Sequence, residues 1–466
     1  MFRIFNQYVS PKSLILMFLE SGLVLLSLLC AVRLRFWNSP SDAAAYIVYP
    51  DFVIQCGIVI VVFFFCFYCN DLYDAKNGFG SIQRALRIEQ SIGAASLILG
   101  LIYFLVPTLL LSRGVFLIGM ALATLFVLTG RKFLDHLWQL TAPVQHVVIL
   151  GTGQLAMNLA HEIRLRHDLN ISLDGLVSPT NGSASAIAGV PVLGTAAEIE
   201  SIAQRGLVSR IIVALEDRRG VLPTRALVSL RVRGIRVEDA ATALSALTGR
   251  VSLDAVKPSW FVFSDGFHRS KWNELLKRVL DLFAATVGLA LSAPLMLLVG
   301  LAVRFDSKGP VLYRQTRVGR MGKTFELLKF RSMRTDAEHL TGAQWATQDD
   351  PRVTRVGRFI RKYRLDELPQ FINVIRGHMS FVGPRPERPY FVEELRNVIP
   401  YYDERHSVRP GITGWAQVQY PYGASVEDAF KKLEYDLFYL KNVSLVFDLA
   451  IIFQTIRIVT GGHGGR

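Results

Sequence analysis

The sequence predicts three parts: an α-helical membrane bundle, a Rossmann-like α/β domain, and a mixed α/β domain with a re-entrant membrane helix. Three observations support this order. Apolar residues crowd the first third of the 466-residue chain, a glycine-rich turn follows a buried-strand pattern after residue 145, and basic segments fill the chain beyond residue 304. These patterns place the parts at residues 1–142, 143–264 and 265–466, with the re-entrant helix at about 279–303.

The first part carries four apolar segments, near 14–32, 52–69, 91–111 and 114–130. Each has about the ~20 residues that a helix needs to cross a hydrocarbon core. Residues 1–32 lack the small-residue cleavage site of a signal peptide, so we expect the first segment to stay as an anchor. Cations before the first segment, in the 76–87 connection and at 131–132 favour a bundle with both ends in the cytoplasm.

All four cysteines lie in this apolar part, at Cys30, Cys56, Cys66 and Cys69, which is typical of a protein from a reducing compartment. Cys66 and Cys69 have the C-x-x-C spacing of metal and redox sites. Because the surrounding VVFFFCFYCN contains no histidine and no charge, packing is the favoured interpretation.

The second part opens with QHVVILGTGQLAMNLAHEI, which is typical of a buried strand, a Gly151-x-Gly153-x-x-Ala156 turn and an amphipathic helix. Later strand-like runs alternate with helical stretches, as a parallel sheet requires. A ribose-binding acid is expected at the end of the second strand, but Val177-Ser178-Pro179 stands there. The pattern therefore favours a structural or regulatory domain over a working dinucleotide site.

Residues 282–303 form an uncharged run that is long enough to cross a membrane. Pro294 lies near its middle, two residues after Ser292, and a proline removes a backbone donor and bends a helix in the preceding turn. Cations flank both ends of the run, whereas a crossing helix usually shows them at one end. We therefore expect the segment to enter and leave the membrane on the cytoplasmic side.

The third part is strongly basic, with 16 Lys/Arg against 8 Asp/Glu between residues 304 and 376. In GPVLYRQTRVGRMGKTFELLKFRSM, strand alternation would place Lys329 and Arg331 on one face. Glycine and proline hold Arg385 in the turn of FVGPRPERP, and Arg409 precedes the turn of RPGITGWAQV. For any single cation, a solvated surface is the simpler interpretation. No nucleic-acid partner is expected, because glycines and prolines accompany these cations in place of stacking aromatics.

An adjacent acid pair, Asp366 and Glu367, follows a run of cations in IRKYRLDELPQFINVIRG. Acids at a helix start are usually only caps. Arginines in rigid turns together with two carboxylates nevertheless match phosphoryl chemistry, in which cations bind oxygens and a carboxylate holds a divalent metal or attacks phosphorus. The pattern predicts a phosphate-handling site.

These motifs, in this order and after KRVLDLFAATVGLALSAPL, resemble the bacterial polyprenyl-phosphate hexose-1-phosphate transferases, also called monotopic phosphoglycosyl transferases. The resemblance covers about residues 265–466, and the preceding parts resemble the long form of that family, which starts exopolysaccharide or O-antigen assembly. It implies Mg²⁺-dependent transfer of a sugar 1-phosphate from a UDP-sugar to undecaprenyl phosphate, with release of UMP and a covalent intermediate. It also implies a multi-pass protein of the bacterial inner membrane, bound to lipid, with a cytoplasmic catalytic domain and a homodimeric state.

By this resemblance Asp366 is the nucleophile and Glu367 its partner, and the two are the metal ligands. The residues that would hold substrate phosphates are Lys329, Arg361, Arg385 and Arg409, with Arg331 as a weaker candidate. In the family an adjacent Ser-Pro commonly breaks the membrane helix, whereas Ala293 separates the two residues here. The bend then rests on Pro294, and the hydrogen bonding of Ser292 is left open.

The helix after Asp366 is expected to end at Gly377 and to point its N-terminal dipole at the phosphate, which would keep Asp366 ionised. Its expected buried face consists of Leu368, Phe371, Ile372 and Ile375.

Two other functions stay open. A membrane-anchored regulatory protein would sense a nucleotide with its sheet domain and bind anionic lipid with its basic part, and this function would tolerate Asp366→Asn. An NAD-dependent sugar-nucleotide enzyme would use the glycines at 151 and 153, but the acid after the second strand is absent. The transferred sugar is also open among glucose, galactose and N-acetylated sugars, because the shared motifs do not determine it.

Overall fold

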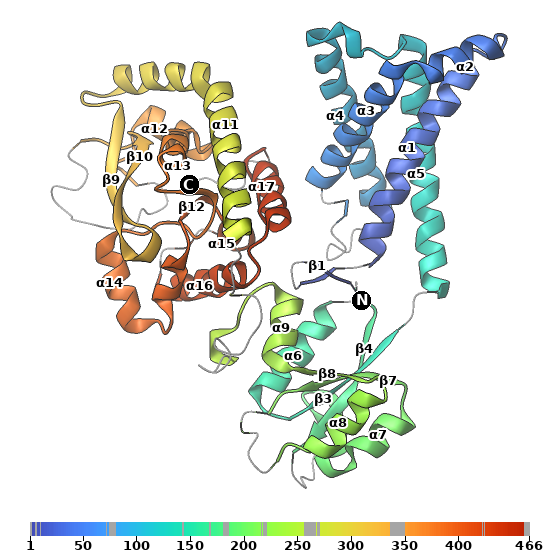
Figure 1. Ribbon diagram of the computed structural model, residues 1–466, viewed down its shortest axis with the longest axis vertical. Coiled ribbons are helices and arrows are strands. Elements are labelled where there is room, and N and C mark those ends of the chain that lie inside the picture. Colours follow the sequence, from blue (N-terminus) through green and yellow to red (C-terminus); the bar gives the residue numbers. More distant parts are fainter. Residues whose placement is uncertain are drawn as a thin grey trace. The chain divides into compact units, whose positions relative to one another are not determined.

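The computed structural model describes residues 2–4, 7–9, 11–70, 72–73, 81–141, 144–166, 169–179, 186–215, 217, 221–255, 267, 271–335, 350–421, 423 and 425–460. Apart from a few N-terminal residues, the chain divides into two compact units at the junction of Asp239 and Ala240. The first unit contains a helical bundle and a parallel sheet, and the second runs from Ala240 to the C-terminus (Figure 1).

Five helices form the bundle: α1 (Pro11–Arg35), α2 (Pro40–Val48), α3 (Pro50–Cys69), α4 (Ser81–Leu105) and α5 (Arg113–Thr141). All except α2 are long and apolar enough to cross a membrane, which bears out the four predicted segments. The third segment ends at Leu105 and not at residue 111, because Pro107 starts the 3-10 turn η1 (Pro107–Leu109). Two short N-terminal strands, β1 (Phe2–Ile4) and β2 (Gln7–Val9), pair with each other.

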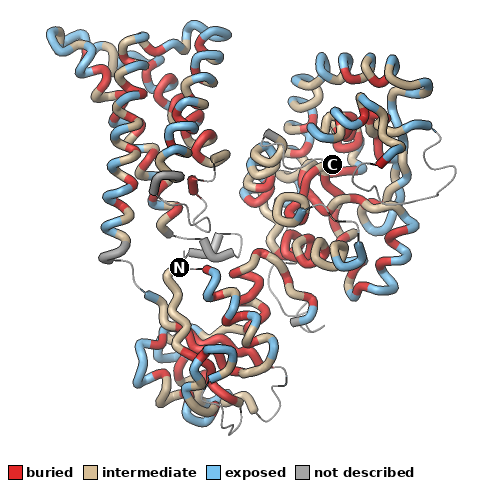
Figure 2. Tube along the Cα trace, turned by 180° about the vertical axis from the view of Figure 1, so that it is seen from behind, coloured by how far each residue is buried: buried red, intermediate tan, exposed pale blue. Residues whose placement is uncertain are grey.

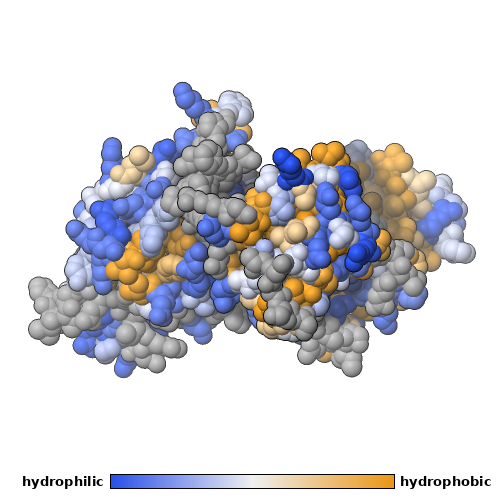
Figure 3. All heavy atoms as spheres, turned by 90° about the horizontal axis from the view of Figure 1, so that it is seen from below, coloured by the Kyte–Doolittle hydropathy of each residue, from blue (hydrophilic) through white to orange (hydrophobic). Residues whose placement is uncertain are grey.

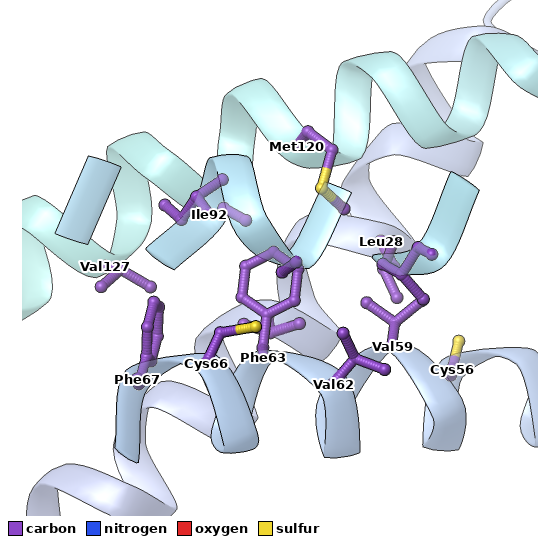
Figure 4. Close-up of a cluster of buried hydrophobic side chains, with 14 of the residues drawn as sticks. Leu28, Cys56, Val59, Val62, Phe63, Cys66, Phe67, Ile92, Met120 and Val127 are labelled. Atoms are coloured by element: carbon purple, nitrogen blue, oxygen red, sulfur yellow. The ribbon is translucent and has the colours of Figure 1, made fainter. Parts of the chain in front are cut away.

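Of the two C-x-x-C cysteines that the sequence analysis assigns to packing, Cys66 lies in the bundle core and Cys69 is half-buried. Cys66 is buried on α3 beside Phe63 and Phe67, and Figure 4 shows it facing the other helices together with these rings. The outward residues are apolar as well: Phe104 is 81% exposed. The visible part of the bundle in Figure 3 is accordingly largely hydrophobic. Such a surface suits contact with lipid.

The sheet domain has the six-stranded order β5-β6-β4-β3-β7-β8, parallel except for the β5–β6 pair. Its strands are β3 (Gln145–Leu150), β4 (Ile171–Ser178), β5 (Ala186–Ile187), β6 (Val190–Thr195), β7 (Val208–Val213) and β8 (Arg236–Asp239). Its helical elements are α6 (Gln154–Leu165), η3 (Ala196–Glu198), α7 (Ile199–Arg205) and α8 (Thr224–Val232). The central strands β3, β4 and β7 carry the buried centre of this domain (Figure 2). This arrangement confirms the Rossmann-like prediction.

Gly151 ends β3 as the glycine-rich turn requires. Its φ is +137°, and a Cβ at this position would approach the carbonyl oxygen of Ala214 to 2.4 Å. Only glycine fits here, so the turn motif has a structural reason that is independent of any nucleotide.

Among the described residues, the elements before the strands of the second unit are α9 (Ala240–Thr248), η4 (Leu253–Ala255) and α11 (Lys271–Asp306). A hairpin follows, of β9 (Leu312–Val318), η5 (Arg320–Gly322) and β10 (Thr324–Phe330). The next elements are α12 (Arg355–Lys362), η6 (Leu365–Glu367), α13 (Gln370–Ile375), β11 (Ser380–Val382), α14 (Pro389–Val398) and η7 (Tyr402–Ser407). The unit ends with β12 (Gly411–Thr413), which is parallel to β11, then α15 (Trp415–Gln419), α16 (Val426–Lys441) and α17 (Leu445–Thr460).

An aromatic core joins the last three helices. Trp415 packs on Phe447 with ring centroids 5.0 Å apart, and Phe438 lies against both rings. The Trp415 indole nitrogen donates to the carbonyl of Gly249 at 2.7 Å, and Arg250 pairs with Glu434 at 3.1 Å. Residues 249 and 250, directly after α9, therefore pack within the second unit, although the predicted boundary at 264/265 groups them with the sheet domain.

Helix α11 is continuous and contains Pro294, and Figure 1 shows a sharp bend within it. Ser292 Oγ donates to the carbonyl of Gly288 at 2.6 Å. Ser292 therefore contributes a hydrogen bond to the turn that precedes Pro294, although Ala293 stands between Ser292 and Pro294. Leu291 is 77% exposed within the second unit. A bent, apolar and uncovered helix suits the re-entrant prediction, which stays a prediction.

Candidate functional site

The acid pair lies in η6, between α12 and α13. Arg364 precedes it in the left-handed conformation, with φ of 53°, and turns the chain out of α12. Asp366 and Glu367 are both buried, each with 8% exposure. Helix α13 begins only at Gln370 and has six residues. The pair thus sits in a separate 3-10 turn before the helix, and the expectation that the helix dipole points at a bound phosphate stays a prediction.

Asn373 fixes α13 against strand β10. Its Oδ1 accepts the N–H of Leu328 at 3.0 Å, and its Nδ2 donates to the carbonyl of Glu326 at 2.7 Å. These two bonds turn Gln370, Asn373 and Val374 inward. Gly377 ends the helix as predicted, with φ of 84°.

The predicted buried face of α13 is wrong. Ile375 is exposed, and Leu368, Phe371 and Ile372 are only partly buried. Apolar periodicity indicated the wrong face because buried polar bonds to the strand, which periodicity does not register, set the orientation of the helix.

Three cations surround the Glu367 carboxylate. Arg385 Nη2 donates to Oε1 at 2.6 Å, Lys329 Nζ lies 3.7 Å from the same oxygen, and Arg364 Nη1 lies 3.7 Å from Oε2. They come from the loop after β11, from β10 and from the turn before η6. The structure thus brings Lys329 and Arg385 to the acid pair. It also adds Arg364, and the signal in the sequence was its place two residues before Asp366.

The two acids differ sharply in their electrostatics. Burial, followed by the charge of Glu367, raises the pKa of Asp366 to about 6, against the opposing cations Lys329 and Arg361. Burial also acts to raise the pKa of Glu367, but Arg385, Lys329 and Arg364 outweigh it and hold that pKa well below its usual range. Burial and Glu367 therefore oppose the ionisation of Asp366 that the sequence analysis expects. A value of about 6 still leaves it mostly ionised at pH 7.

Lys329 shares this environment. Burial lowers its pKa to about 8, and Glu367 partly offsets the effect. The Asp366 carboxylate forms no hydrogen bond or ion pair with the residues that the structure describes. The site therefore contains the Glu367 carboxylate, which three cations neutralise, and the Asp366 carboxylate, which is available to bind or attack a substrate. Titratable groups whose pKa values are pushed apart are typical of catalytic acids and nucleophiles.

Arg361 lies on α12, close enough for its charge to lower the pKa of Asp366. Arg331 lies elsewhere: its Nη2 donates to the carbonyl of Ser307 at 2.6 Å and its Nη1 to that of Lys308 at 3.0 Å, beyond the end of α11. Strand β10 ends at Phe330, so strand alternation does not carry the side chain of Arg331 to the face of Lys329.

Arg409 also lies apart from the acid pair. Its Nε donates to the carbonyl of Gly377 at 3.1 Å, and it lines a pocket together with Lys277 and Arg320. Phosphate binding by Arg331 and Arg409 stays a prediction to which these positions add no support.

A divalent cation can be tested against the same geometry. Within the described ranges, no three His, Cys, Asp or Glu side chains gather in a way that could hold a metal ion. Mg²⁺ usually needs only one or two protein carboxylates, because substrate phosphates and water complete its shell. The Asp366–Glu367 pair fits that requirement, with Asp366 as the carboxylate not engaged by an arginine.

Comparison with known proteins shows which family this chain resembles. A family described as "Bacterial sugar transferase" matches residues 272–462, which contain the whole acid-pair site. An exopolysaccharide production protein of Rhizobium leguminosarum is 42% identical over 199 residues, covering 41% of this chain and 98% of that protein. The chain belongs to the bacterial sugar transferase family. A second family, described as "CoA-binding domain", matches residues 69–237.

Two further relatives of this bacterial sugar transferase carry more detailed names. A UDP-glucose:undecaprenyl-phosphate glucose-1-phosphate transferase of Xanthomonas campestris is 29% identical over 98% of this chain and 96% of its own length. A UDP-N-acetylgalactosamine-undecaprenyl-phosphate N-acetylgalactosaminephosphotransferase of Aeromonas hydrophila is 46% identical over 47% of this chain. The chain spans about half of the Aeromonas protein, 51% of its length.

Proposed function

We propose that this protein transfers a sugar 1-phosphate from a UDP-sugar to undecaprenyl phosphate and releases UMP, as a phosphotransferase of the EC 2.7.8 class in exopolysaccharide or related glycan assembly. The names of the Xanthomonas and Aeromonas relatives support the substrates. The observation that carries the proposal is the buried Asp366 carboxylate, which forms no hydrogen bond or ion pair with the described residues and lies beside a Glu367 neutralised by three cations.

In the first step, an Asp366 oxygen attacks the phosphorus that bears the sugar. The bond from this phosphorus to the bridging oxygen breaks, and UMP leaves with that oxygen. In the second step, a phosphate oxygen of undecaprenyl phosphate attacks the same phosphorus, and the phosphorus–Asp366 bond breaks to restore the carboxylate. Atoms and charge balance, with a covalent phosphosugar between the steps.

The neighbouring side chains suit the roles that these steps need. Lys329, Arg361 and Arg385 come from three different elements around the pair and would bind the diphosphate oxygens. Bound Mg²⁺ would neutralise phosphate charge, with Asp366 and Glu367 as its protein ligands. Glu367 keeps its negative charge at the centre of the cations and so orders them before substrate binds.

The proposed setting is the bacterial inner membrane, with the acid pair on the cytoplasmic face and a homodimer as the assembly. The bend at Pro294 and the cations on both flanks of α11 support a helix that enters and leaves on that face. UDP-sugars are cytoplasmic, so this topology would place the acid pair on the side of its donor substrate.

The test is UMP release by the purified full-length protein, with undecaprenyl phosphate and a panel of UDP-glucose, UDP-galactose, UDP-N-acetylglucosamine and UDP-N-acetylgalactosamine. We expect release with at least one sugar, loss of release on chelation of Mg²⁺, and loss in Asp366→Asn. Absence of release with every donor, together with lipid binding that Asp366→Asn leaves unchanged, would favour the regulatory protein.

A further inference from the structure

The loop that carries Arg385 is anchored through its main chain to a buried arginine. Arg405, on η7, donates from Nη2 to the carbonyl oxygen of Arg385 at 3.0 Å. The side chain of the same Arg385 reaches Glu367 at 2.6 Å. Arg385 thus connects Arg405, which binds its carbonyl oxygen, with Glu367, which its guanidinium contacts.

Arg405 is itself held rigidly. Its Nε and Nη2 lie 3.0 and 2.8 Å from Asp436 Oδ2, and its Nη1 donates to the Tyr402 hydroxyl at 2.7 Å. Asp436, on α16, is 1% exposed and Arg405 7%. Burying two charges costs free energy that their attraction only partly returns, so such a pair is weak evidence for a stabilising role. The burial of this ion pair therefore needs another explanation. The other hydrogen bond of Arg405, to the carbonyl of Arg385, offers one.

A second cation holds the next residues of this loop. Arg317, on β9, donates from Nη1 to the carbonyl of Pro386 at 3.0 Å and contacts the Glu387 carboxylate at 3.2 Å. The N–H of Val318 bonds the carbonyl of Glu387 at 2.9 Å. The loop is therefore fixed at successive carbonyls, which leaves little freedom in where the Arg385 side chain emerges.

We propose that Arg405, held by Asp436, is a positioning residue that fixes Arg385 on Glu367. The inference rests on the proposed function for its kinetic consequence. Arg385 needs its guanidinium placed to well under 1 Å, since a shift of about 1 Å at a reacting centre costs up to ~100-fold in rate. Arg405 touches neither acid, so its effect passes through the Arg385 main chain.

Arg405→Lys is the informative variant. A lysine keeps the charge opposite Asp436, but one ammonium cannot replace a planar fork that reaches Asp436, Tyr402 and the Arg385 carbonyl together. We expect kcat to fall about tenfold in folded protein. The matched control is Arg250→Lys, which weakens an arginine pair to the same helix α16, through Glu434, without touching the Arg385 loop. It should leave kcat unchanged.

A double-mutant cycle separates positioning from general damage. In an Arg385→Ala background, Arg405→Lys should lower kcat no further, because the side chain that it positions is gone. A merely structural role would lower the active fraction by the same factor in both backgrounds. Equal loss in both backgrounds, or equal kcat in Arg405→Lys and Arg250→Lys, would overturn the proposal. If Arg405→Lys does not accumulate, Asp436→Asn takes its place in the same cycle.

Hydrogen exchange tests the anchor without any activity. The peptide over residues 381–389 should exchange faster in Arg405→Lys and at the wild-type rate in Arg250→Lys. Unchanged exchange in Arg405→Lys would also overturn the proposal. A wild-type protein that releases no UMP would instead count against the proposed function, and the exchange result would still decide the role of Arg405.

Discussion

Replacing Asp366 by asparagine should abolish transfer and at the same time stabilise the protein. The folded carboxyl has a pKa of about 6 against an ordinary value of 3.8, because burial and Glu367 disfavour its charge. Because the folded pKa lies above the unfolded one, the contribution of Asp366 to stability is fully present below pH 4 and is lost as the pH rises through 6. The difference between the folded and unfolded pKa values of Asp366 corresponds to about 3 kcal/mol of unfolding free energy lost at neutral pH. Asparagine has no charge to bury, so a gain of about 1–3 kcal/mol is expected.

Glu367→Gln provides the opposite control at the adjacent position. Its carboxylate is neutralised by Arg385, Lys329 and Arg364, and its pKa lies below the usual range. Removing the charge leaves three cations facing one another in a buried site, which should cost about 2–4 kcal/mol. Two isosteric substitutions on neighbouring residues therefore change stability with opposite signs.

The assay is thermal unfolding of the full-length protein in lipid nanodiscs, with chelator and without substrate, between pH 4.5 and 8. A unit of this size shifts its Tm by about 2–4 °C per kcal/mol. Asp366→Asn should therefore unfold several degrees above wild type at pH 7.5 and converge with it toward pH 4.5. A lower Tm for Asp366→Asn at pH 7.5, or a higher one for Glu367→Gln, would refute this account of the site.

Three further predictions concern the pH dependence of the rate, two glycines and the topology of α11. The rate should be bell-shaped in pH, rising as Asp366 ionises near 6 and falling as Lys329 loses its proton near 8, and a full rate at pH 5 would contradict this. Gly309→Ala should lower the Tm in the same melting assay, because the φ of Gly309 is +128° and the new Cβ would lie 2.1 Å from Arg331 Nη1. Gly300→Ala is the control and should be tolerated, because the nearest atom to its Cβ lies at 3.4 Å. In a cysteine-free background, single cysteines at Lys271 and Lys308 should both be shielded from an impermeant thiol reagent in intact cells, and labelling of the second alone would mean that α11 crosses the membrane.

Local sequence signals predicted the features of the fold and of the site that depend on local backbone geometry. Gly151 was identifiable because only glycine fits the turn after β3, and Pro294 because it must disturb the helix that contains it. Glycine and proline around Arg385 indicated a rigid loop, and Arg385 does reach Glu367. In each case the residue type and its immediate neighbours carry the constraint.

The features that the sequence did not reveal depend on partners that are distant in sequence. Asn373 bonds the main chain of β10, and this overrode the apolar periodicity of α13. Arg331 and Arg409 bind main-chain carbonyls at Ser307 and Gly377, which no local pattern indicates.

The pairing of Arg405 with Asp436 joins η7 to α16 across 31 positions. A single sequence shows two charged residues there, in separate segments. It does not show that both are buried, nor that the arginine also holds the carbonyl of the Arg385 loop.

The central claim is that Asp366 carries the phosphosugar, and mass spectrometry tests it directly. Purified enzyme is incubated with its UDP-sugar and Mg²⁺ but without undecaprenyl phosphate, then quenched in acid and digested. We predict a sugar-phosphate adduct on the peptide that contains Asp366, matched by one UMP per active enzyme, lost when undecaprenyl phosphate is added, and missing in Asp366→Asn. An adduct on another residue, or steady turnover by Asp366→Asn, would contradict the claim.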